Sequence, residues 1–447
     1  MKHIALFGSG KSSHVLINYL IENAEVQDWT IYIGDMDTSE LQKRISSTSR
    51  IHFFQFNIQD ENTLTPILEK IDVAISMVPA MYHMNIAVLC LRHNKHLITP
   101  SYISEDMQSL HEAAKEKGLI FLNEMGLDPG IDHMSAMKII HSIHARGGEI
   151  SSFKSYCGGL IAPSSDNNPW NYKFTWNPRN VVLAGQGKGG IKYLSKGKFK
   201  YIPYYNLFKN VQTISIAKYG DFDGYPNRDS LKYRSIYGLD HIQTMLRGTL
   251  RRNGFCSAWD IFVQLGMTDD TYVLDIDRNT SCADFLNCFI QFDSSGDIRA
   301  NLAQQLKLDL NDVRLDKLAW LDIFNPHVII DAVGSPAQIL QAILERKLKL
   351  EPEDKDWVLM YHEFEFSEKN VLKKMTSSLS IEGVDSYETA MALTVGLPIG
   401  IACKLICSEK INQRGVLLPI DAEFYAPILE ELTHYGIDFV EEEGSVF

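Results

Sequence analysis

The segment 126–133 (GLDPGIDH) places a carboxylate where a ligand site is expected. A strand-like apolar run, Leu119–Leu122, precedes it. From Ile131 onward apolar residues recur three or four positions apart, which predicts a helix. Asp128 then stands at the N-cap and Pro129 at the first helical position. A carboxylate and free backbone N–H groups would meet at the end of a strand, which is where open α/β sheets bind ligands.

A glycine turn near the N-terminus has the spacing of a dinucleotide site. The apolar run Ile4–Phe7 ends in this turn, and a helical pattern begins a few residues later. The first glycine allows a tight turn and the second lets the backbone approach a pyrophosphate, while Ser13 takes the third position, where packing needs only a small residue. A plain strand-to-helix turn is the alternative. The cofactor-binding candidates here are Gly8, Ser9, Gly10 and Ser12.

The elements around both segments predict a parallel sheet. Apolar runs alternate with helical stretches, and this alternation is typical of strands joined by right-handed helical crossovers. Six such strands match a doubly wound Rossmann fold. The predicted strands are Ile4–Phe7, Trp29–Ile33, Ile51–Phe56, Val73–Met77, His96–Thr99 and Leu119–Leu122.

Further cofactor candidates follow the second, third and fourth predicted strands. Asp35 follows the second strand, where an acid accepts hydrogen bonds from the adenosine ribose hydroxyls and repels a 2′-phosphate. A solvated loop acid is the alternative. Asn57 and Val78 follow the next two strands and fall at the same edge of the sheet, with Val78 placed to line the nicotinamide.

Two arginine-containing segments and an aromatic loop mark the middle of the chain. Residues 167–179 are rich in Asn and aromatic residues and lack a helical or strand period, which is typical of a site-lining loop. Arg228 lies in the turn-rich segment 224–230, and Arg251 in the segment 247–252. Because Arg grips a carboxylate at two points, both are candidates for binding an anion, with surface arginines as the alternative.

We expect an α/β protein with a doubly wound Rossmann domain and an α+β substrate domain that carries a helical insertion. The Rossmann domain is predicted for residues 1–125, completed by the C-terminal segment 390–447. The substrate domain is predicted for residues 126–240 and 350–390, with a helical subdomain over 241–350.

Composition limits the partners. The net charge of −13 argues against a nucleic acid or an acidic membrane, which favour a basic face. Seven scattered cysteines without a C-x-x-C pair are typical of reduced thiols, so we expect a cytoplasmic protein without a metal site or a signal peptide. The most membrane-like run, Ala390–Cys403, is predicted to be a buried core segment, since it is shorter than about 18 residues.

Five motifs together resemble saccharopine dehydrogenase of the glutamate-forming type, also called saccharopine reductase, in the family's order and over essentially the whole chain. Residues 394–398 (TVGLP) and the tail match the family too. The five motifs are 126–133 (GLDPGIDH), 155–160 (SYCGGL), 168–176 (NPWNYKFTW), 225–230 (YPNRDS) and 247–251 (RGTLR).

This resemblance implies the reversible oxidation of saccharopine by NAD(P)+ to L-glutamate and 2-aminoadipate 6-semialdehyde, a step of lysine metabolism that needs no metal. By position, the substrate-binding residues would be Ser101, Tyr102, Asp128, Arg228, Thr249 and Arg251. The dinucleotide would be held by Ser9, Gly10, Asn57, Ile58, Val78, Leu127, Pro129 and Trp176. Asp128, Tyr102 and Lys173 are the catalytic candidates, and Lys173 would either handle protons or bind a carboxylate.

Departures from the family pattern leave alternatives open. The fungal NADPH-using members carry an Arg-containing segment after the second strand, where this chain has Gly34-Asp35-Met36, so we predict a preference for NAD(H). Residues 160–171 also depart, which leaves the exact substrate open. The alternatives are a carboxynorspermidine-like dehydrogenase, which would need acids in place of the arginines, and a non-catalytic nucleotide-binding protein of the same fold. The direction of the reaction is open, and the expected assembly is a homodimer with a small-molecule amino acid as substrate.

Overall fold

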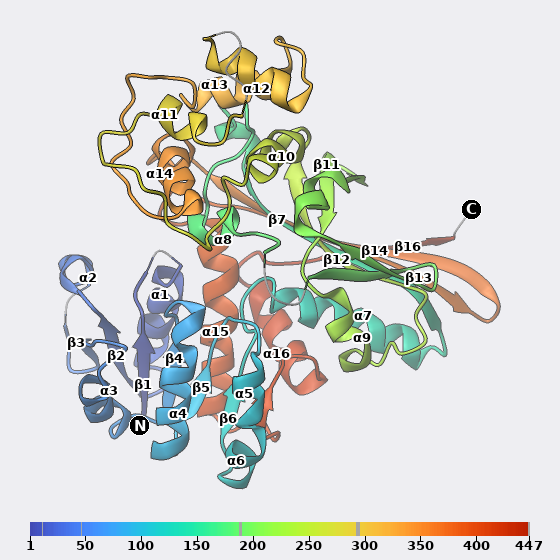
Figure 1. The fold of residues 1–447 in the computed structure, drawn as a ribbon. Helices are drawn as coiled ribbons and strands as arrows, with labels where there is room; N and C mark the ends of the chain where they lie inside the picture. Colours follow the sequence, from blue (N-terminus) through green and yellow to red (C-terminus); the bar gives the residue numbers. More distant parts are fainter. Residues whose placement is uncertain (11, 46, 187–189, 292–295, 446–447) are drawn as a thin grey trace. The chain divides into compact units, whose positions relative to one another are not determined.

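The chain forms two compact units in the computed structural model, which describes residues 1–447 except 11, 46, 187–189, 292–295 and 446–447 (Figure 1). The first unit contains Met1–Glu149, Leu379–Gly383 and Tyr387–Val440. The second unit contains Ile150–Ser378, Val384–Ser386 and Glu441–Phe447.

The first unit is built on a seven-stranded parallel sheet with the order β15-β6-β5-β4-β1-β2-β3. This sheet confirms the predicted Rossmann-like fold, and its first six strands lie where the apolar runs predicted them. The seventh strand comes from the C-terminal part of the chain and pairs with β6. The strands are β1 (Lys2–Phe7), β2 (Trp29–Asp35), β3 (Ile51–Gln55), β4 (Val73–Ser76), β5 (His96–Ile98), β6 (Ile120–Leu122) and β15 (Gly415–Leu417).

Helices between these strands bury apolar residues against the sheet. Several begin at a side-chain cap: Asp60 accepts a hydrogen bond from Asn62 N before α3, and Ser104 accepts one from Met107 N before α5. The helices of this unit are α1 (His14–Ala24), α2 (Ser39–Arg44), α3 (Glu61–Leu68), η1 (Ala80–Tyr82), α4 (His83–His93), α5 (Glu105–Ser109), α6 (His111–Glu116), α7 (Ile131–Ala145), α15 (Ala390–Cys407) and α16 (Ala422–Thr433).

Helix α15 joins the C-terminal part of the chain to the start of the sheet. It lies against α1, as Figure 1 shows by the contrast of red and blue ribbons. A Cβ atom at Gly396 would come within 2.8 Å of the Leu16 backbone nitrogen, and one at Gly400 within 2.4 Å of the Tyr19 ring, so glycine permits this close packing. With 18 residues α15 is longer than the predicted run and apolar enough to cross a membrane, but 78% of it is buried inside the protein. It is the core helix that the sequence predicted.

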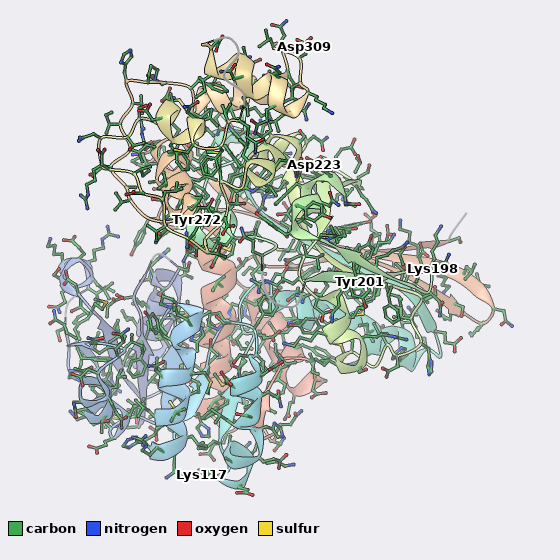
Figure 2. All side chains as sticks on the ribbon, viewed as in Figure 1. Lys117, Lys198, Tyr201, Asp223, Tyr272 and Asp309 are labelled. Atoms are coloured by element: carbon green, nitrogen blue, oxygen red, sulfur yellow. The ribbon has the colours of Figure 1, made fainter. Side chains whose placement is uncertain are left out.

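The second unit contains a larger, mixed sheet with the order β10-β11-β12-β7-β13-β14-β16, to which the β8–β9 hairpin is added through β12. Strands β7 and β12 are parallel, while β11 is antiparallel to β12. The strands are β7 (Glu149–Ile161), β8 (Ile191–Ser195), β9 (Lys198–Ile202), β10 (Gln212–Ile216), β11 (Gly220–Pro226), β12 (Thr244–Arg252), β13 (Asp356–Glu368), β14 (Val371–Glu382) and β16 (Val440–Ser445). Lys198 and Tyr201 mark the exposed β9 in Figure 2.

Helices form a second core in this unit. Trp170 is fully buried there, stacked on Phe262 with ring centroids 5.8 Å apart, so this departure from the family pattern is a packing residue. Residues 244–252, which the predicted helical subdomain 241–350 includes, form the strand β12 and pair with β7 and β11. The helices are η2 (Pro163–Ser165), α8 (Pro178–Val182), η3 (Tyr204–Lys209), η4 (Ser230–Lys232), α9 (Tyr233–Ile236), α10 (Phe255–Leu265), α11 (Cys282–Asn287), α12 (Ile298–Leu306), α13 (Val313–Trp320) and α14 (Pro336–Leu348).

Candidate active site

In the first unit, Asp35 and the glycine turn are directly hydrogen-bonded. Asp35 Oδ2 accepts from Ser9 N at 2.6 Å and from Ser9 Oγ at 2.9 Å, while its Oδ1 accepts from Met36 N at 2.7 Å. The carboxylate at the end of β2 therefore holds the turn after β1 in place.

The two glycines of this turn have different surroundings. Gly8 has φ +102°, and a Cβ there would come within 2.9 Å of the Met77 backbone after β4, so only glycine fits. Gly10 is exposed, and a Cβ there would meet nothing within 4 Å. The turn is thus tight on one side and open on the other, which fits the approach of a dinucleotide pyrophosphate.

The other cofactor candidates of this unit follow β3, β4 and β6. Asn57 is exposed, and its side-chain oxygen accepts a hydrogen bond from Gln59 N at 3.0 Å, so it already stabilises the turn after β3. Ile58 and Val78 are partly buried against the apolar core of the first unit. Leu127 and Pro129 are buried. The structure leaves part of Ile58 and Val78 accessible to a ligand.

The turns after β5 and β6 bring Tyr102 and Asp128 together. The Tyr102 hydroxyl donates to Asp128 Oδ1 at 2.9 Å, and both side chains are half-buried. Glu124 fixes the two turns, because its Oε1 accepts from Ile103 N at 2.9 Å and its Oε2 lies 2.7 Å from His133 Nε2. A phenol and a carboxylate in direct contact can exchange or orient a proton.

The predicted N-cap role of Asp128 is wrong. Helix α7 begins at Ile131 with Gly130 as its N-cap, and Asp128 and Pro129 are joined by a cis peptide bond in the preceding turn. Gly130 has φ +147°, and a Cβ there would clash with Gly126 O at 1.9 Å, so the turn needs glycine at this point. Asp132 accepts from Gly130 N at 2.7 Å instead, which leaves the Asp128 carboxylate to contact Tyr102.

In the second unit, the predicted substrate residues lie along the β11–β12 pair. Arg251 on β12 is buried, Thr249 is half-buried opposite Tyr225, and Arg228 is exposed in the turn after β11 with φ +50°. Asn227 N donates to Arg247 O, so Arg228 lies beside the residues next to Arg247 on β12. Arg251 is four or five residues further along this strand, which corresponds to roughly 15 Å between the two backbones. The backbones of the two arginines are therefore well separated along the β11–β12 pair.

Arg251 is surrounded by aromatic rings. Its guanidinium carbon lies 5.2 Å from the centroid of the Tyr172 ring and 5.5 Å from that of Phe255. One of its terminal nitrogens, NH1, donates to Leu250 O at 3.0 Å, while Nε and the buried Tyr172 hydroxyl make no hydrogen bond in the described part of the chain. Burial raises the pKa of Tyr172, so its hydroxyl is neutral and can donate.

The acid nearest to Arg251 by strand register does not neutralise it. Asp223 on β11 is the residue opposite Arg251 in the strand register, and Figure 2 labels Asp223. Its Oδ2 accepts from Gly254 N at 3.0 Å and from Cys256 N at 3.4 Å, at the start of α10. Within the described ranges no ion pair involves Arg251, so no side chain there neutralises this buried cation.

Lys173 is placed differently from Arg251. Its ammonium group is buried and lies 2.5 Å from Asp354 Oδ2, which also accepts from Glu351 N at 2.7 Å. Its neighbour Phe174 donates its backbone N–H to Leu348 O at 2.7 Å. Lys173 and Phe174 thus connect the aromatic loop 167–179 to the segment 348–354. The sequence did not reveal that Asp354 is the partner of Lys173.

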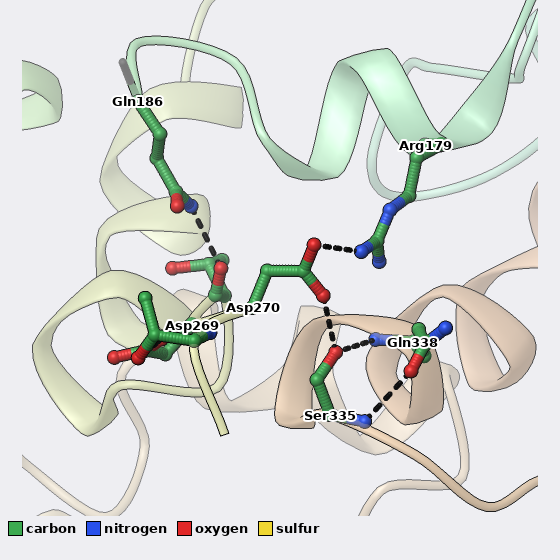
Figure 3. A network of polar contacts seen from close by, with 8 residues as sticks. Arg179, Gln186, Asp269, Asp270, Ser335 and Gln338 are labelled. Atoms are coloured by element: carbon green, nitrogen blue, oxygen red, sulfur yellow. Dashed lines mark hydrogen bonds and ion pairs between the residues drawn. The ribbon is translucent and has the colours of Figure 1, made fainter. Parts of the chain in front are cut away.

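Trp176, the cofactor candidate of the second unit, is 36% exposed at the end of this loop. The following helix, α8, is fixed by the polar network of Figure 3, in which Arg179 pairs with Asp270 and Asp270 Oδ1 accepts from Ser335 Oγ at 2.5 Å. Ser335 in turn caps α14 through a capping box with Gln338. Trp176 is therefore exposed beside a helix that this network links to α14.

Sequence reasoning missed four residues that support these sites: His83, Glu124, Tyr172 and Asp354. Their side-chain partners lie 7 to 181 residues away in sequence, so a local pattern could not identify them. Only for Tyr172 did the sequence contain a signal, because this residue lies within the aromatic loop that was predicted to line a site.

Comparisons with known proteins assign both units to the same family. The family model described as "Saccharopine dehydrogenase NADP binding domain" matches residues 4–122, and "Saccharopine dehydrogenase C-terminal domain" matches residues 126–437. The chain belongs to the saccharopine dehydrogenase family. The recognised resemblance is thereby confirmed, and the family membership makes this chain an oxidoreductase with a nicotinamide dinucleotide as cofactor.

Relatives in this family match nearly the whole length of this chain. Saccharopine dehydrogenase [NADP(+), L-glutamate-forming] of Schizosaccharomyces pombe is 33% identical over 453 residues, which cover 99% of each chain. Alpha-aminoadipic semialdehyde synthase of Arabidopsis thaliana is 33% identical over 442 residues, but this chain spans only 41% of its length. The structure of apo saccharopine dehydrogenase (L-Glu forming) from Saccharomyces cerevisiae superimposes with a TM-score of 0.87 at 30% identity, covering all of both chains.

Proposed function

We propose that this saccharopine dehydrogenase family member interconverts saccharopine with L-glutamate and 2-aminoadipate 6-semialdehyde, as a step of lysine metabolism. The observation that supports the substrate best is Arg251, a buried cation without a carboxylate partner among the described residues. Saccharopine has three carboxylates, and a guanidinium binds a carboxylate through two parallel hydrogen bonds.

The residues of the glycine turn would hold the dinucleotide, whose chemistry would be hydride transfer with the carbon next to the secondary amine of saccharopine. The substrate imine that remains adds water and then splits into the amine of glutamate and the aldehyde. Asp128, held by the Tyr102 hydroxyl, would accept the proton of the secondary amine, and the pair could return it to the departing amine. Arg251 and Arg228 would each hold one of the carboxylates of saccharopine.

Purified protein tests this reaction in both directions. We expect saccharopine-dependent formation of reduced nicotinamide, followed by absorbance, and its reversal with glutamate and the semialdehyde. Turnover of a carboxylated polyamine but not of saccharopine would favour the related polyamine dehydrogenase. Nucleotide binding without turnover of either substrate would favour the non-catalytic alternative.

The choice between NAD(H) and NADP(H) needs its own test. The names of the relatives and of the family model print NADP and favour that cofactor. Asp35 favours NAD(H) instead. Its carboxylate is hydrogen-bonded to the glycine turn at the end of β2, where an acid would bind the adenosine ribose and repel a 2′-phosphate. We retain the preference for NAD(H) as a prediction based on this residue.

Initial rates with NADH and NADPH decide this point, and a lower KM for NADPH would contradict the NAD(H) preference without affecting the proposed substrate. Asp35→Asn keeps an oxygen to accept from Ser9 N but removes the charge. We expect this variant to improve kcat/KM for NADPH by about tenfold, the equivalent of a charge interaction of ~1.4 kcal/mol. Asp37→Asn, in the same turn, is the matched control.

We also propose that the protein works in the cytoplasm. All seven cysteines are free thiols, and four of them are buried, which suits a reducing compartment. Fractionation of cells that express a tagged protein tests this proposal.

A further inference from the structure

A buried imidazole lies where β4 and β5 end, under the predicted substrate residue Ser101. His83 is the first residue of α4 and is 4% exposed. Ser76 Oγ, at the end of β4, lies 2.7 Å from His83 Nδ1. On the other side of the ring, His83 Nε2 lies 2.7 Å from Ser101 Oγ and 3.1 Å from Thr99 Oγ1, both after β5. Three hydroxyls at the ends of β4 and β5 thus surround one ring. The two strands are parallel neighbours in the sheet (Figure 1).

The ring of His83 is neutral at physiological pH. Burial lowers the pKa of His83 to about 4. A neutral imidazole has one nitrogen that donates a hydrogen bond and one that accepts. The roles of the two nitrogens therefore determine the roles of the hydroxyls around them.

The surroundings of Ser76 decide which nitrogen carries the hydrogen. Ser76 is fully buried, and the only hydrogen-bond partner of its hydroxyl among the described residues is His83 Nδ1. If Nδ1 carried the hydrogen, the hydroxyl hydrogen of Ser76 would be buried without an acceptor, which is unfavourable. Ser76 must therefore donate to Nδ1, and Nε2 must carry the ring hydrogen.

This tautomer fixes the role of Ser101. Its Oγ is the closer of the two hydroxyl oxygens to Nε2, so it accepts the ring hydrogen. Its own hydrogen has no other acceptor in the described part of the chain and is left to donate to a ligand. Ser101 O also accepts from Glu124 N at 3.1 Å, which fixes its backbone beside the Tyr102–Asp128 turn.

We propose that His83 is a positioning residue that fixes Ser101 as a hydrogen-bond donor to a carboxylate oxygen of the substrate. A carboxylate only accepts hydrogen bonds, so a serine that has already accepted one from the imidazole matches it. This inference rests on the proposed function, because it takes Ser101 as a saccharopine-binding residue. It assigns a role to a histidine that makes no contact with the substrate itself.

Two substitutions separate the two sides of the ring. In His83→Gln the amide nitrogen takes the place of Nε2 and can still donate to Ser101, while His83→Asn can reach only Ser76. We expect His83→Asn to raise KM for saccharopine about tenfold, the effect of losing one oriented hydrogen bond, with little change in the KM for the dinucleotide. His83→Gln should recover most of the wild-type KM.

Ser101→Ala provides the coupling test. It should raise KM for saccharopine as His83→Asn does, and the double variant should show no further loss, because both remove the same hydrogen bond. Equal losses in His83→Asn and His83→Gln, or losses that multiply in the double variant, would overturn the inference and point to a structural role. Thermal melting of each variant confirms that it is folded.

Nitrogen NMR of histidine-labelled wild-type protein gives a readout without any variant or substrate. We expect the His83 ring in the Nε2–H form, unprotonated until the pH falls to about 4. The Nδ1–H form would overturn the inference. Failure of the wild-type protein to turn over saccharopine would instead overturn the proposed function, and the two failures are therefore distinguishable.

Discussion

Lys173 and Arg251 are both buried cations of the second unit, but their surroundings differ. The two side chains belong to residues that are 3% and 5% exposed. Lys173 lies 2.5 Å from the carboxylate of Asp354, whereas Arg251 has aromatic rings around it and no carboxylate partner within the described residues. A buried charge is costly unless it is paired, so the two arrangements cannot serve the same purpose.

The difference indicates which cation stabilises the fold and which one is kept for a ligand. Asp354 neutralises Lys173 and also accepts from Glu351 N, so this pair connects two segments of the unit. Near Arg251, Asp223 accepts from the start of α10 instead, and the buried hydroxyl of Tyr172 has no hydrogen-bond partner among the described residues. A substrate carboxylate would satisfy Arg251 and Tyr172 at once.

The largest effect is expected from Lys173→Met. It leaves the Asp354 carboxylate buried without its cation, which should lower the free energy of unfolding by ~3–5 kcal/mol. Asp354→Asn in the same chain should restore most of the loss, because no buried charge remains. Urea unfolding followed by fluorescence measures both variants.

The same pair tests the predicted catalytic role of Lys173. If the lysine only stabilises the fold, the double variant Lys173→Met with Asp354→Asn should recover kcat together with stability. Recovered stability with a kcat that stays low would show that the ammonium group takes part in the reaction.

Arg251→Met should have the opposite profile. The methionine side chain replaces much of the arginine stem, and no ion pair with a described residue is lost. We therefore expect the free energy of unfolding to change by less than about 1 kcal/mol. The value of kcat/KM for saccharopine should fall about 100-fold, since a charge-assisted contact of ~2–3 kcal/mol is lost. Steady-state kinetics beside urea unfolding measure both quantities.

Arg251→Lys is the matched control for this prediction. It keeps the charge but loses the two-point grip, so its kcat/KM should lie between those of the wild type and Arg251→Met. A strongly destabilised Arg251→Met with unchanged kcat/KM would show that Arg251 supports the fold as Lys173 does.

The sequence predicted elements well where the signal was local, and less well where the partner lies far along the chain. Strands β1 to β6 followed from apolar runs of a few residues, and the glycine turn at Gly8 followed from its spacing. The start of α7 was misplaced because Gly130 with φ +147°, and not Asp128, precedes the helix. Asp354 is 181 residues from Lys173, so no sequence pattern could show that Lys173 is neutralised.

The smallest effect is expected from Tyr172→Phe, and it tests whether Arg251 and Tyr172 bind one carboxylate. This buried hydroxyl has no partner in the part of the chain that the structure describes, so its removal should leave the free energy of unfolding unchanged or raise it by up to ~1 kcal/mol. If this hydroxyl donates to the carboxylate held by Arg251, KM for saccharopine should rise about fivefold, the loss of one hydrogen bond of ~1 kcal/mol. In the Arg251→Met background the same change should have almost no effect on KM, because the carboxylate is no longer held there. A fivefold rise of KM in that background as well would mean that Tyr172 and Arg251 bind different groups of the substrate. Arg251 would then be the only one of the two that is kept for this carboxylate.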